Sequence, residues 1–99
     1  MILIREVFKL KVGKAKEAKE LFKEAQKLGK KYGYPEGRAL TDLTGPYYTF
    51  VWETTFKSVG DWEKAMSDTT GAEEFGKWYQ KFAPLLEHGG HREIFTVVE

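Results

Sequence analysis

The sequence predicts an α+β fold in which two helical regions cover one face of an antiparallel β-sheet. The clearest strand is residues 47–56, YYTFVWETTF, where aromatic and β-branched side chains alternate with a period of two. Apolar residues recur with helical spacing before it, in residues 14–32, and after it, in residues 58–82. Further strands are expected near both ends of the chain, so the predicted element order is β-α-β-β-α-β.

The first strand and the first helix are defined by their apolar positions. From residue 2 to residue 12 the even positions are almost wholly apolar and the odd positions are mixed, as in a strand covered by helices on one side. The helix over residues 14–32 then has one apolar stripe, formed by Ala15, Ala18, Leu21, Phe22, Ala25 and Leu28. Gly33 suits the left-handed position after the helix and Pro35 prevents its continuation, whereas Gly29 costs about 1 kcal/mol inside it.

Two weaker strands complete the expected sheet. Residues 36–44 form a short strand, and Gly45 and Pro46 turn the chain into the central strand. Residues 89–90, both glycine, form a later turn, after which residues 91–98 are expected to be the last strand.

The second helical region is expected to be broken into two segments. Ser58 and Asp61 resemble a capping box that opens the first segment. Residues 68–71 interrupt it, and Thr70 with Glu73 is expected to cap the second segment. The inward-facing residues are predicted to be Val59, Trp62, Ala65 and Met66 in the first segment, and Ala72, Phe75, Trp78, Tyr79 and Phe82 in the second.

This element order favours the ferredoxin-like arrangement, because two right-handed crossovers over an antiparallel sheet place the first and third strands at its centre. Both helical regions then cover the same face. The other face would expose apolar side chains, namely Leu3, Val7, Tyr47, Thr49, Val51 and either Phe95 or Ile94. Such a patch approaches the ~300–600 Å² of the largest apolar patch on a typical monomer. We therefore expect a homodimer that pairs through this helix-free face, with Glu53 in a salt bridge across the dimer.

Composition limits the classes of protein and partner. The 99 residues suit one domain, residues 1–99, and the formal net charge of +1 argues against nucleic acid as the main partner. No apolar run is long enough to span a membrane, and Arg5 and Glu6 come too early for a signal peptide, so a cytoplasmic location is expected. The chain has no Cys, which excludes disulfides and thiolate metal sites. It also has no Asn and many Lys and Glu residues, which suggests a thermophilic source.

An aromatic cluster is the best candidate for a binding site. The rings of the central strand and of the second helical region are expected to meet, and five of them would line a slot: Tyr48, Trp52, Trp62, Trp78 and Tyr79. Such a slot would accept a small apolar or aromatic ligand, with the Tyr and Trp edges orienting it. The alternative, which we favour, is that these rings form the core, because a domain this small needs most of its aromatic residues for stability.

Glu6 and His91 are the candidates for a catalytic proton acceptor. Glu6 is the one carboxylate on the apolar face of the first strand, where burial would raise its pKa, and the favoured alternative is an ion pair with Arg38, Arg92 or a lysine. His91 enters the last strand near the end of the second helical region, within potential reach of the slot. His88 and His91 are three residues apart, but no Cys or obvious third ligand accompanies them, so no metal site is expected.

Several stretches resemble one superfamily. Residues 8–14, FKLKVGK, look like the strand, K-P-G-K and helix opening of dimeric α+β barrel proteins, with valine where proline is usual. Residues 44–46, TGP, followed by the aromatic strand and residues 56–61, FKSVGD, are similar to the central part of the NIPSNAP family. Residues 75–86, FGKWYQKFAPLL, and the closing residues 92–95, REIF, resemble both NIPSNAP-like and antibiotic-biosynthesis-monooxygenase-like members.

The resemblance implies a dimer whose two sheets face each other in a barrel, with a ligand pocket between the sheet and the helices of each protomer. The enzymes of this group include cofactor-independent oxygenases of quinols or polycyclic aromatics and haem-degrading oxygenases. Many use an Asn on the first strand, which this chain lacks, and haem degraders use a helical His, which the second helix does not offer before His88. NIPSNAP-like members have no agreed reaction, so the resemblance to them implies no particular chemistry for this chain.

The sequence and the resemblance together predict a NIPSNAP-like homodimeric domain with an aromatic-lined pocket and no cofactor. The alternative is a cofactor-independent oxygenase of the antibiotic-biosynthesis-monooxygenase-like group, of the quinol, aromatic or haem-degrading type.

Overall fold

The computed structural model describes residues 1–88 and 90–99, and its elements follow the predicted order. The strands are β1 (Ile2–Lys9), β2 (Arg38–Thr41), β3 (Thr49–Phe56) and β4 (His91–Thr96). The helices are α1 (Ala15–Lys31), α2 (Val59–Thr70) and α3 (Glu73–Phe82), followed by a 3₁₀ helix, η1 (Ala83–Leu85). The predicted break in the second helical region is confirmed between α2 and α3. The predicted turn at residues 89–90 includes Gly89, which lies outside the described residues.

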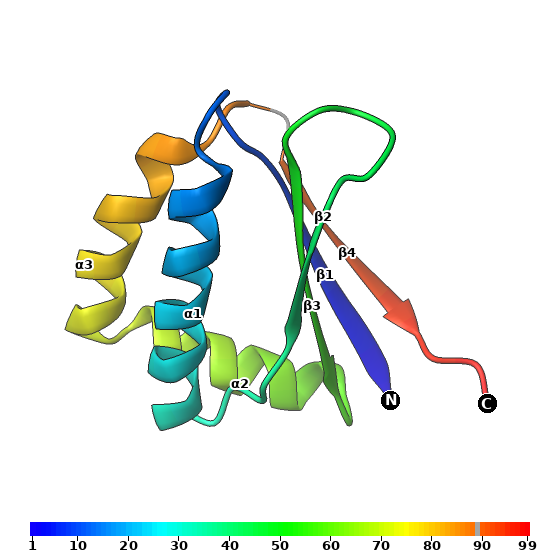
Figure 1. The fold of residues 1–99 in the computed structure, drawn as a ribbon. Helices are drawn as coiled ribbons and strands as arrows, with labels where there is room; N and C mark the ends of the chain where they lie inside the picture. Colours follow the sequence, from blue (N-terminus) through cyan, green and yellow to red (C-terminus); the bar gives the residue numbers. More distant parts are fainter. Residues whose placement is uncertain (89) are drawn as a thin grey trace.

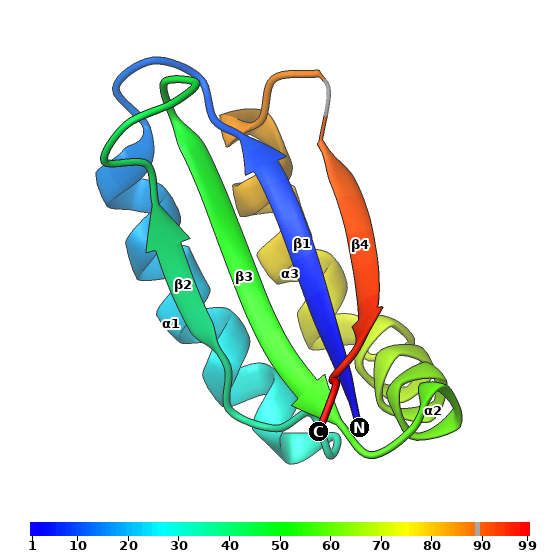
Figure 2. The same cartoon turned by 90° about the vertical axis from the view of Figure 1, so that its right-hand side faces the viewer.

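The four strands form one antiparallel sheet in the order β2-β3-β1-β4. The strands β1 and β3 occupy its centre, as predicted, and the three α-helices lie on one side of it (Figure 1). Figure 2 shows the sheet from its other side, with these helices behind the strands. This is the ferredoxin-like α+β fold that the sequence predicts.

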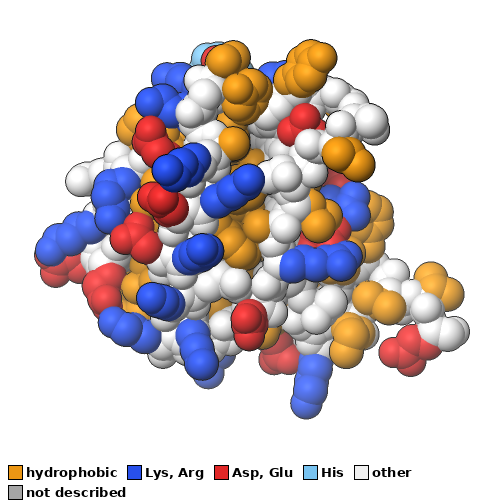
Figure 3. All heavy atoms as spheres, viewed as in Figure 1, with side chains coloured by type: hydrophobic (Ala, Val, Ile, Leu, Met, Phe, Trp, Pro, Cys, Tyr) orange, Lys and Arg blue, Asp and Glu red, His pale blue; other side chains and the backbone are white. Residues whose placement is uncertain are grey.

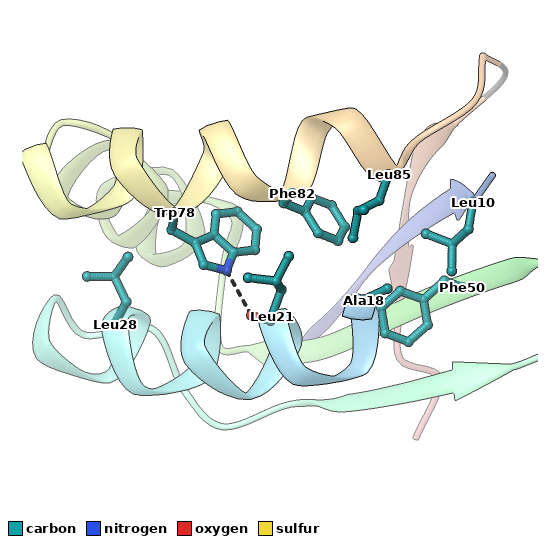
Figure 4. Packing of buried hydrophobic residues seen from close by; sticks show 8 residues of the cluster. All are labelled: Leu10, Ala18, Leu21, Leu28, Phe50, Trp78, Phe82 and Leu85. Carbon is teal, nitrogen blue, oxygen red and sulfur yellow. Dashed lines mark hydrogen bonds between the residues drawn. The ribbon is translucent and has the colours of Figure 1, made fainter. Parts of the chain in front are cut away.

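Two hydrophobic clusters lie between the sheet and the helices. The larger one consists of Leu10, Ala18, Leu21, Leu28, Phe50, Trp78, Phe82 and Leu85 (Figure 4). Within it, Nε1 of Trp78 donates a 2.8 Å hydrogen bond to the carbonyl oxygen of Leu21, which ties α3 to α1. The smaller cluster consists of Ile2, Ile4, Phe56 and Ala65. Trp62 packs against this second cluster, whereas Val59, which was predicted to face inward, is exposed.

Charged side chains cover the outer side of the helices, as Figure 3 shows for Lys, Arg, Asp and Glu. Some of these side chains pair between α1 and α3. Nζ of Lys31 lies 2.9 Å from Oε2 of Glu74, and Nζ of Lys81 lies 3.4 Å from Oε1 of Glu24. Because these pairs are exposed, water screens them, and hydrophobic packing rather than charge holds the helices on the sheet.

The central strands are shorter than predicted because the chain changes direction at Tyr48. The φ angle of Tyr48 is 60°, in the left-handed region that bulky residues rarely adopt, and this ends the alternation of the strand. The backbone N–H of Leu10 donates to the carbonyl oxygen of Tyr48 at 2.9 Å, and the N–H of Lys11 donates to that of Leu85 at 2.8 Å. Leu10 and Lys11 therefore remain paired beyond the end of β1, and Leu10 forms an isolated antiparallel bridge with Leu86. The edge strands β2 and β4 are also shorter than their predicted ranges.

One of the two predicted helix caps is present. Oγ of Ser58 accepts a 3.2 Å hydrogen bond from the backbone N–H of Asp61, which confirms the cap of α2. The predicted cap at Thr70 is wrong, because Thr70 is still inside α2 and its hydroxyl donates to the carbonyl oxygen of Met66 at 2.8 Å. Ala72 occupies the N-cap position of α3 without a side-chain hydrogen bond.

Gly29, which is unfavourable by helix propensity, is explained by packing. A Cβ atom at this position would lie 2.9 Å from Cβ of Tyr34, so only glycine leaves room for the chain to return across the helix end. The backbone N–H of Tyr34 donates to the carbonyl oxygen of Gly29 at 2.9 Å. Gly33 between them has a φ of 85°, which confirms its predicted left-handed conformation.

We predict opposite effects for two glycine-to-alanine substitutions in helices. Gly29→Ala should destabilise the protein by about 1–3 kcal/mol, because the new methyl group overpacks against Tyr34. Gly76→Ala, in the middle of α3, meets no atom within 4 Å and should stabilise it by about 0.5–1 kcal/mol. Urea unfolding followed by circular dichroism measures both, and equal effects at the two positions would contradict the packing role of Gly29.

Candidate functional site

A cavity of about 260 Å³ lies between the sheet and the helices. Its walls are mainly aromatic, and the largest rings come from four elements: Phe8 of β1, Phe22 of α1, Trp52 of β3, and Phe75, Trp78 and Phe82 of α3. Side chains of both hydrophobic clusters contribute, because Ile4 and Phe82 both line it. The cavity therefore occupies the junction between the two parts of the core.

Trp52 is the central ring of this arrangement. Its ring centroid lies 4.9 Å from that of Phe8, 5.1 Å from those of Phe22 and Phe82, and 5.7 Å from that of Trp78. Nε1 of Trp52 is buried, and within residues 1–88 and 90–99 it has no hydrogen-bond partner. A buried donor without an acceptor costs about 1–3 kcal/mol.

A group of polar side chains forms one end of the cavity. Glu6 and Arg92 face each other on neighbouring strands and form an ion pair through Oε1 and Nε. The guanidinium carbon of Arg92 lies 5.0 Å from the ring centroid of Trp62, whose Nε1 donates a 3.2 Å hydrogen bond to the hydroxyl of Tyr34. Burial raises the pKa of Tyr34, with a further contribution from Glu6 against the opposing effects of Trp62 and Arg92, so its hydroxyl stays neutral at physiological pH.

The structure separates the predicted ligand-binding residues. Trp52, Trp78 and Tyr79 line the cavity. Trp62 is not part of the cavity lining. It packs against the smaller cluster and contacts two residues that line the cavity, Tyr34 and Arg92. Tyr48 does not line this cavity. It packs against the larger hydrophobic cluster and lines a separate surface hollow beside Leu10, Ala15 and Lys19.

The two candidate proton acceptors lie on opposite faces of the sheet. Glu6 lines the cavity, and the favoured interpretation of it as an ion-pair partner is confirmed, with Arg92 as the partner. His91 does not reach the cavity, because the register of β4 places it opposite Val7 on the helix-free face. There its Nε2 lies 3.1 Å from Oε2 of Glu93.

Sequence reasoning missed Tyr34 as a component of the site. Tyr34 follows the end of α1 in an irregular segment, so neither helical nor strand periodicity placed it. The signal that could have found it is Gly29, since an unfavourable glycine inside a helix indicates a close neighbour. The described residues contain no group of three side chains that could hold a metal ion, and none of their helices is long and apolar enough to cross a membrane.

The helix-free face has a row of four charged side chains, one on each strand, which we call the charged row. In sheet order the row is Arg38, Glu53, Arg5 and Glu93. Oε1 of Glu53 is 2.8 Å from Arg38 and Oε2 is 2.7 Å from Arg5, so this carboxylate is only 3% exposed. Nη1 of Arg5 also lies 3.7 Å from Oε1 of Glu93. The salt bridges of Glu53 observed here are thus within one chain.

Apolar side chains lie on both sides of the charged row. Leu3 and Phe95 are paired on one side, and Val7, Val51 and Leu40 form a row on the other. The register settles one open alternative, because Phe95 lies on this face and Ile94 on the helix face. Tyr47 lies before β3 and is not part of the sheet surface.

Comparisons with known proteins identify the fold. No family model matches the chain, and no curated protein matches its sequence. Among solved structures, protein Atu4242 from Agrobacterium tumefaciens has a TM-score of 0.88 and 16% sequence identity, covering 99% of this chain and 94% of its own. Another structure of that protein describes it as a NIPSNAP family protein with unknown function.

Two other similar structures represent the two groups suggested by the sequence. An uncharacterised NIPSNAP domain protein from Burkholderia xenovorans has a TM-score of 0.85 and 13% identity, covering 99% of this chain and 95% of its own. A candidate antibiotic biosynthesis monooxygenase from Nitrosomonas europaea has a TM-score of 0.75 and 15% identity, covering all of both chains. At these identities the likeness establishes the shared fold, and at that level it confirms the resemblance to both groups.

We predict that Glu53 makes stability depend on pH in the acid range. Burial alone would raise the pKa of Glu53, but hydrogen bonds and charge from Arg38 and Arg5 outweigh it and hold the pKa below its ordinary value of 4.5. The unfolded chain therefore binds a proton at Glu53 at higher pH than the folded protein does. The stabilisation that ionised Glu53 provides is complete above the ordinary pKa of 4.5, and it is lost as the pH falls through the lower pKa of the folded protein. Glu53→Gln should cost about 1.5–3 kcal/mol at neutral pH and much less near pH 3.

Urea unfolding at neutral pH and near pH 3 measures this difference. Glu63→Gln, at an exposed position of α2, is the matched control and should leave the stability unchanged at both pH values. A Glu53→Gln penalty of the same size at both pH values would contradict the assignment.

Proposed function

We propose that the protein, as a single ferredoxin-like domain over residues 1–99, is a homodimeric small-molecule-binding protein. The ligand would be a small, flat, mainly apolar molecule held between the sheet and the helices. The observation that carries this proposal is the aromatic cavity, whose lining includes the polar side chains of Glu6, Tyr34 and Arg92. A core packed to the usual density leaves no cavity of this size.

The dimensions and charges of the cavity restrict the ligand. Its volume of about 260 Å³ is just below the ~300–1,000 Å³ typical of small-molecule sites, which suits a ligand of one or two rings. The opposite charges of Glu6 and Arg92 compensate each other, so the polar end favours an uncharged ligand. The neutral hydroxyl of Tyr34, a residue of the cavity lining, is suited to a carbonyl or hydroxyl oxygen.

The alternative is a cofactor-independent oxygenase, and one observation favours it. The carboxylate of Glu6 lines the same cavity, where it is placed to accept a proton from a bound aromatic hydroxyl. Its ion pair with Arg92 opposes this role, because Oε1 of the carboxylate is already bound by the guanidinium. Oxygen uptake in the presence of a two-ring hydroquinone separates the two functions, since a binding protein takes up the ligand without consuming oxygen.

The proposed dimer forms through the helix-free face of the sheet. This face has two apolar patches, one on each side of the charged row: Leu3 with Phe95, and Val7 with Val51 and Leu40. A second copy is the natural cover, because a two-fold axis brings the same patch of both protomers together and two sheets pack well at about 10 Å.

We predict that filling the cavity weakens ligand binding without unfolding the protein. Ala25→Leu on α1 adds three carbon atoms to the wall, and it should weaken binding of 1-tetralone, a two-ring aromatic ketone, at least about tenfold, or ~1.4 kcal/mol. Ala15→Leu makes the same change at the other end of α1, outside the cavity, and should bind as the wild type does. Isothermal titration calorimetry measures both, and equal affinities for wild type and Ala25→Leu would place the ligand elsewhere.

We predict that a charge on the helix-free face dissociates the dimer. Leu40→Lys places an ammonium group on the apolar surface of β2 and should shift the protein from dimer to monomer at low micromolar concentration. Leu43→Lys makes the same change in the loop after β2, where the side chain is already 97% exposed, and should remain dimeric. Native mass spectrometry gives both masses, and a monomeric wild type would refute the proposed dimer.

A further inference from the structure

One polar side chain interrupts the part of α1 that lines the cavity. The α1 residues in the cavity lining are Phe22, Ala25, Gln26, Leu28 and Gly29. Positions three, four and seven residues apart share one face of a helix, so Gln26 lies on the same face as Phe22 and Gly29. Gln26 is the only one of the five with a polar side chain. A polar group therefore stands in the middle of an otherwise apolar wall.

The amide of Gln26 is held in one orientation. Its Oε1 accepts a 2.7 Å hydrogen bond from the backbone N–H of Gly37. Because a backbone N–H can only donate, the amide atom that faces Gly37 must be the oxygen, and the NH₂ group lies on the other side of the amide. Nε2 has no hydrogen-bond partner within residues 1–88 and 90–99, and it is not one of their fully buried unpartnered atoms. It is therefore accessible to a bound molecule or to water.

Gly37 fixes this amide close to a cavity-lining part of the sheet. A Cβ atom at Gly37 would lie 2.4 Å from the carbonyl oxygen of Glu53 and 2.5 Å from Oγ1 of Thr54, so the backbone of Gly37 is in close contact with β3. Thr54 itself lines the cavity. The hydrogen bond to Gly37 thus uses the oxygen of Gln26 to tie α1 to the segment before β2, and it leaves both amide hydrogens without a structural task.

We propose that Gln26 is a specificity-determining residue of the binding site, whose Nε2 donates a hydrogen bond to a carbonyl oxygen of the ligand. This inference rests on the proposed function and narrows its ligand class to small, flat ring compounds that carry a carbonyl group. A carbonyl oxygen loses its hydrogen bonds to water when it enters the cavity. A donor in the wall therefore decides between a ketone and a hydrocarbon of nearly the same shape.

Tyr34 is a competing donor for the same oxygen, and its hydrogen has another acceptor nearby. Nε1 of Trp62 donates to the hydroxyl oxygen of Tyr34, which leaves that hydroxyl one hydrogen to donate. Burial and then the negative charge of Glu6 raise the pKa of Tyr34, so the carboxylate also attracts this hydrogen. No carboxylate of the described chain is hydrogen-bonded to the amide of Gln26. Its hydrogens are the better donors for a ligand.

Two ligands of nearly the same shape test this role. 1-Tetralone and the hydrocarbon tetralin differ only in the carbonyl group, and isothermal titration calorimetry gives the ratio of their affinities for each variant. Gln26→Glu keeps an oxygen for the N–H of Gly37 and removes only the donor. At pH 8, where the new carboxyl group is ionised, it should weaken binding of 1-tetralone relative to tetralin at least about tenfold.

Two further variants complete the comparison. Gln26→Met removes the amide without adding a charge, and it should lower the same ratio about three- to tenfold. Gln80→Glu makes the glutamate substitution at the only other glutamine of the chain, an exposed residue of α3 outside the cavity lining, and it should keep the ratio of the wild type. Circular dichroism verifies that each variant is folded. If Gln26→Met does not fold without its tie to Gly37, Gln26→Glu, which keeps that tie, decides the test.

The outcomes separate the role of Gln26 from the proposed function itself. An unchanged ratio in both Gln26 variants, with 1-tetralone still bound, would overturn this role and leave the binding site in place. A ratio that falls in Tyr34→Phe but not in the Gln26 variants would assign the carbonyl oxygen to Tyr34 and also overturn it. A wild type that binds neither ligand refutes the proposed function, and the role of Gln26 with it.

Discussion

The contacts of the Trp52 indole are the interaction on which the rest of this structure depends. Its ring touches aromatic side chains from β1, α1, β3 and α3, so one residue joins the sheet to two helices. The sequence left two interpretations of the aromatic cluster open, as core or as ligand slot. The structure shows that they are not exclusive, because Trp78 and Phe82 are buried members of the larger cluster and also line the cavity. Core and candidate site share the same rings.

On the central strands β1 and β3, adjacent residues point to opposite faces of the sheet, and the two faces have different contacts. Glu6 points to the cavity and pairs with Arg92, while its neighbour Arg5 points to the helix-free face and pairs with Glu53. In both cases the partner is on a neighbouring strand at the same register position. These four side chains are therefore paired before any ligand or partner binds, which lowers the cost of burying them later.

The sequence predicted the parts of the fold that depend on periodicity. The element order, the central position of β1 and β3 and the broken second helical region all follow from patterns that extend over several residues. An ion pair of Glu6 was also expected, but the choice of Arg92 among the possible partners comes from the strand register. The details that depend on single residues were not predicted: Tyr48 has a left-handed backbone and lies outside the cavity lining, and the register of β4 places His91 on the other face. No periodicity contains this information. The cytoplasmic location and the thermophilic source remain predictions.

The edge strand β4 connects the candidate site with the helix-free face. Arg92 on this strand points to the cavity, and the two residues beside it, His91 and Glu93, point to the other face. An edge strand has only one neighbour within its own sheet, so its outer edge has unpaired backbone groups. The proposed dimer and the proposed binding site would therefore share β4, with Arg92 on the side of the cavity and its neighbours on the side of the partner.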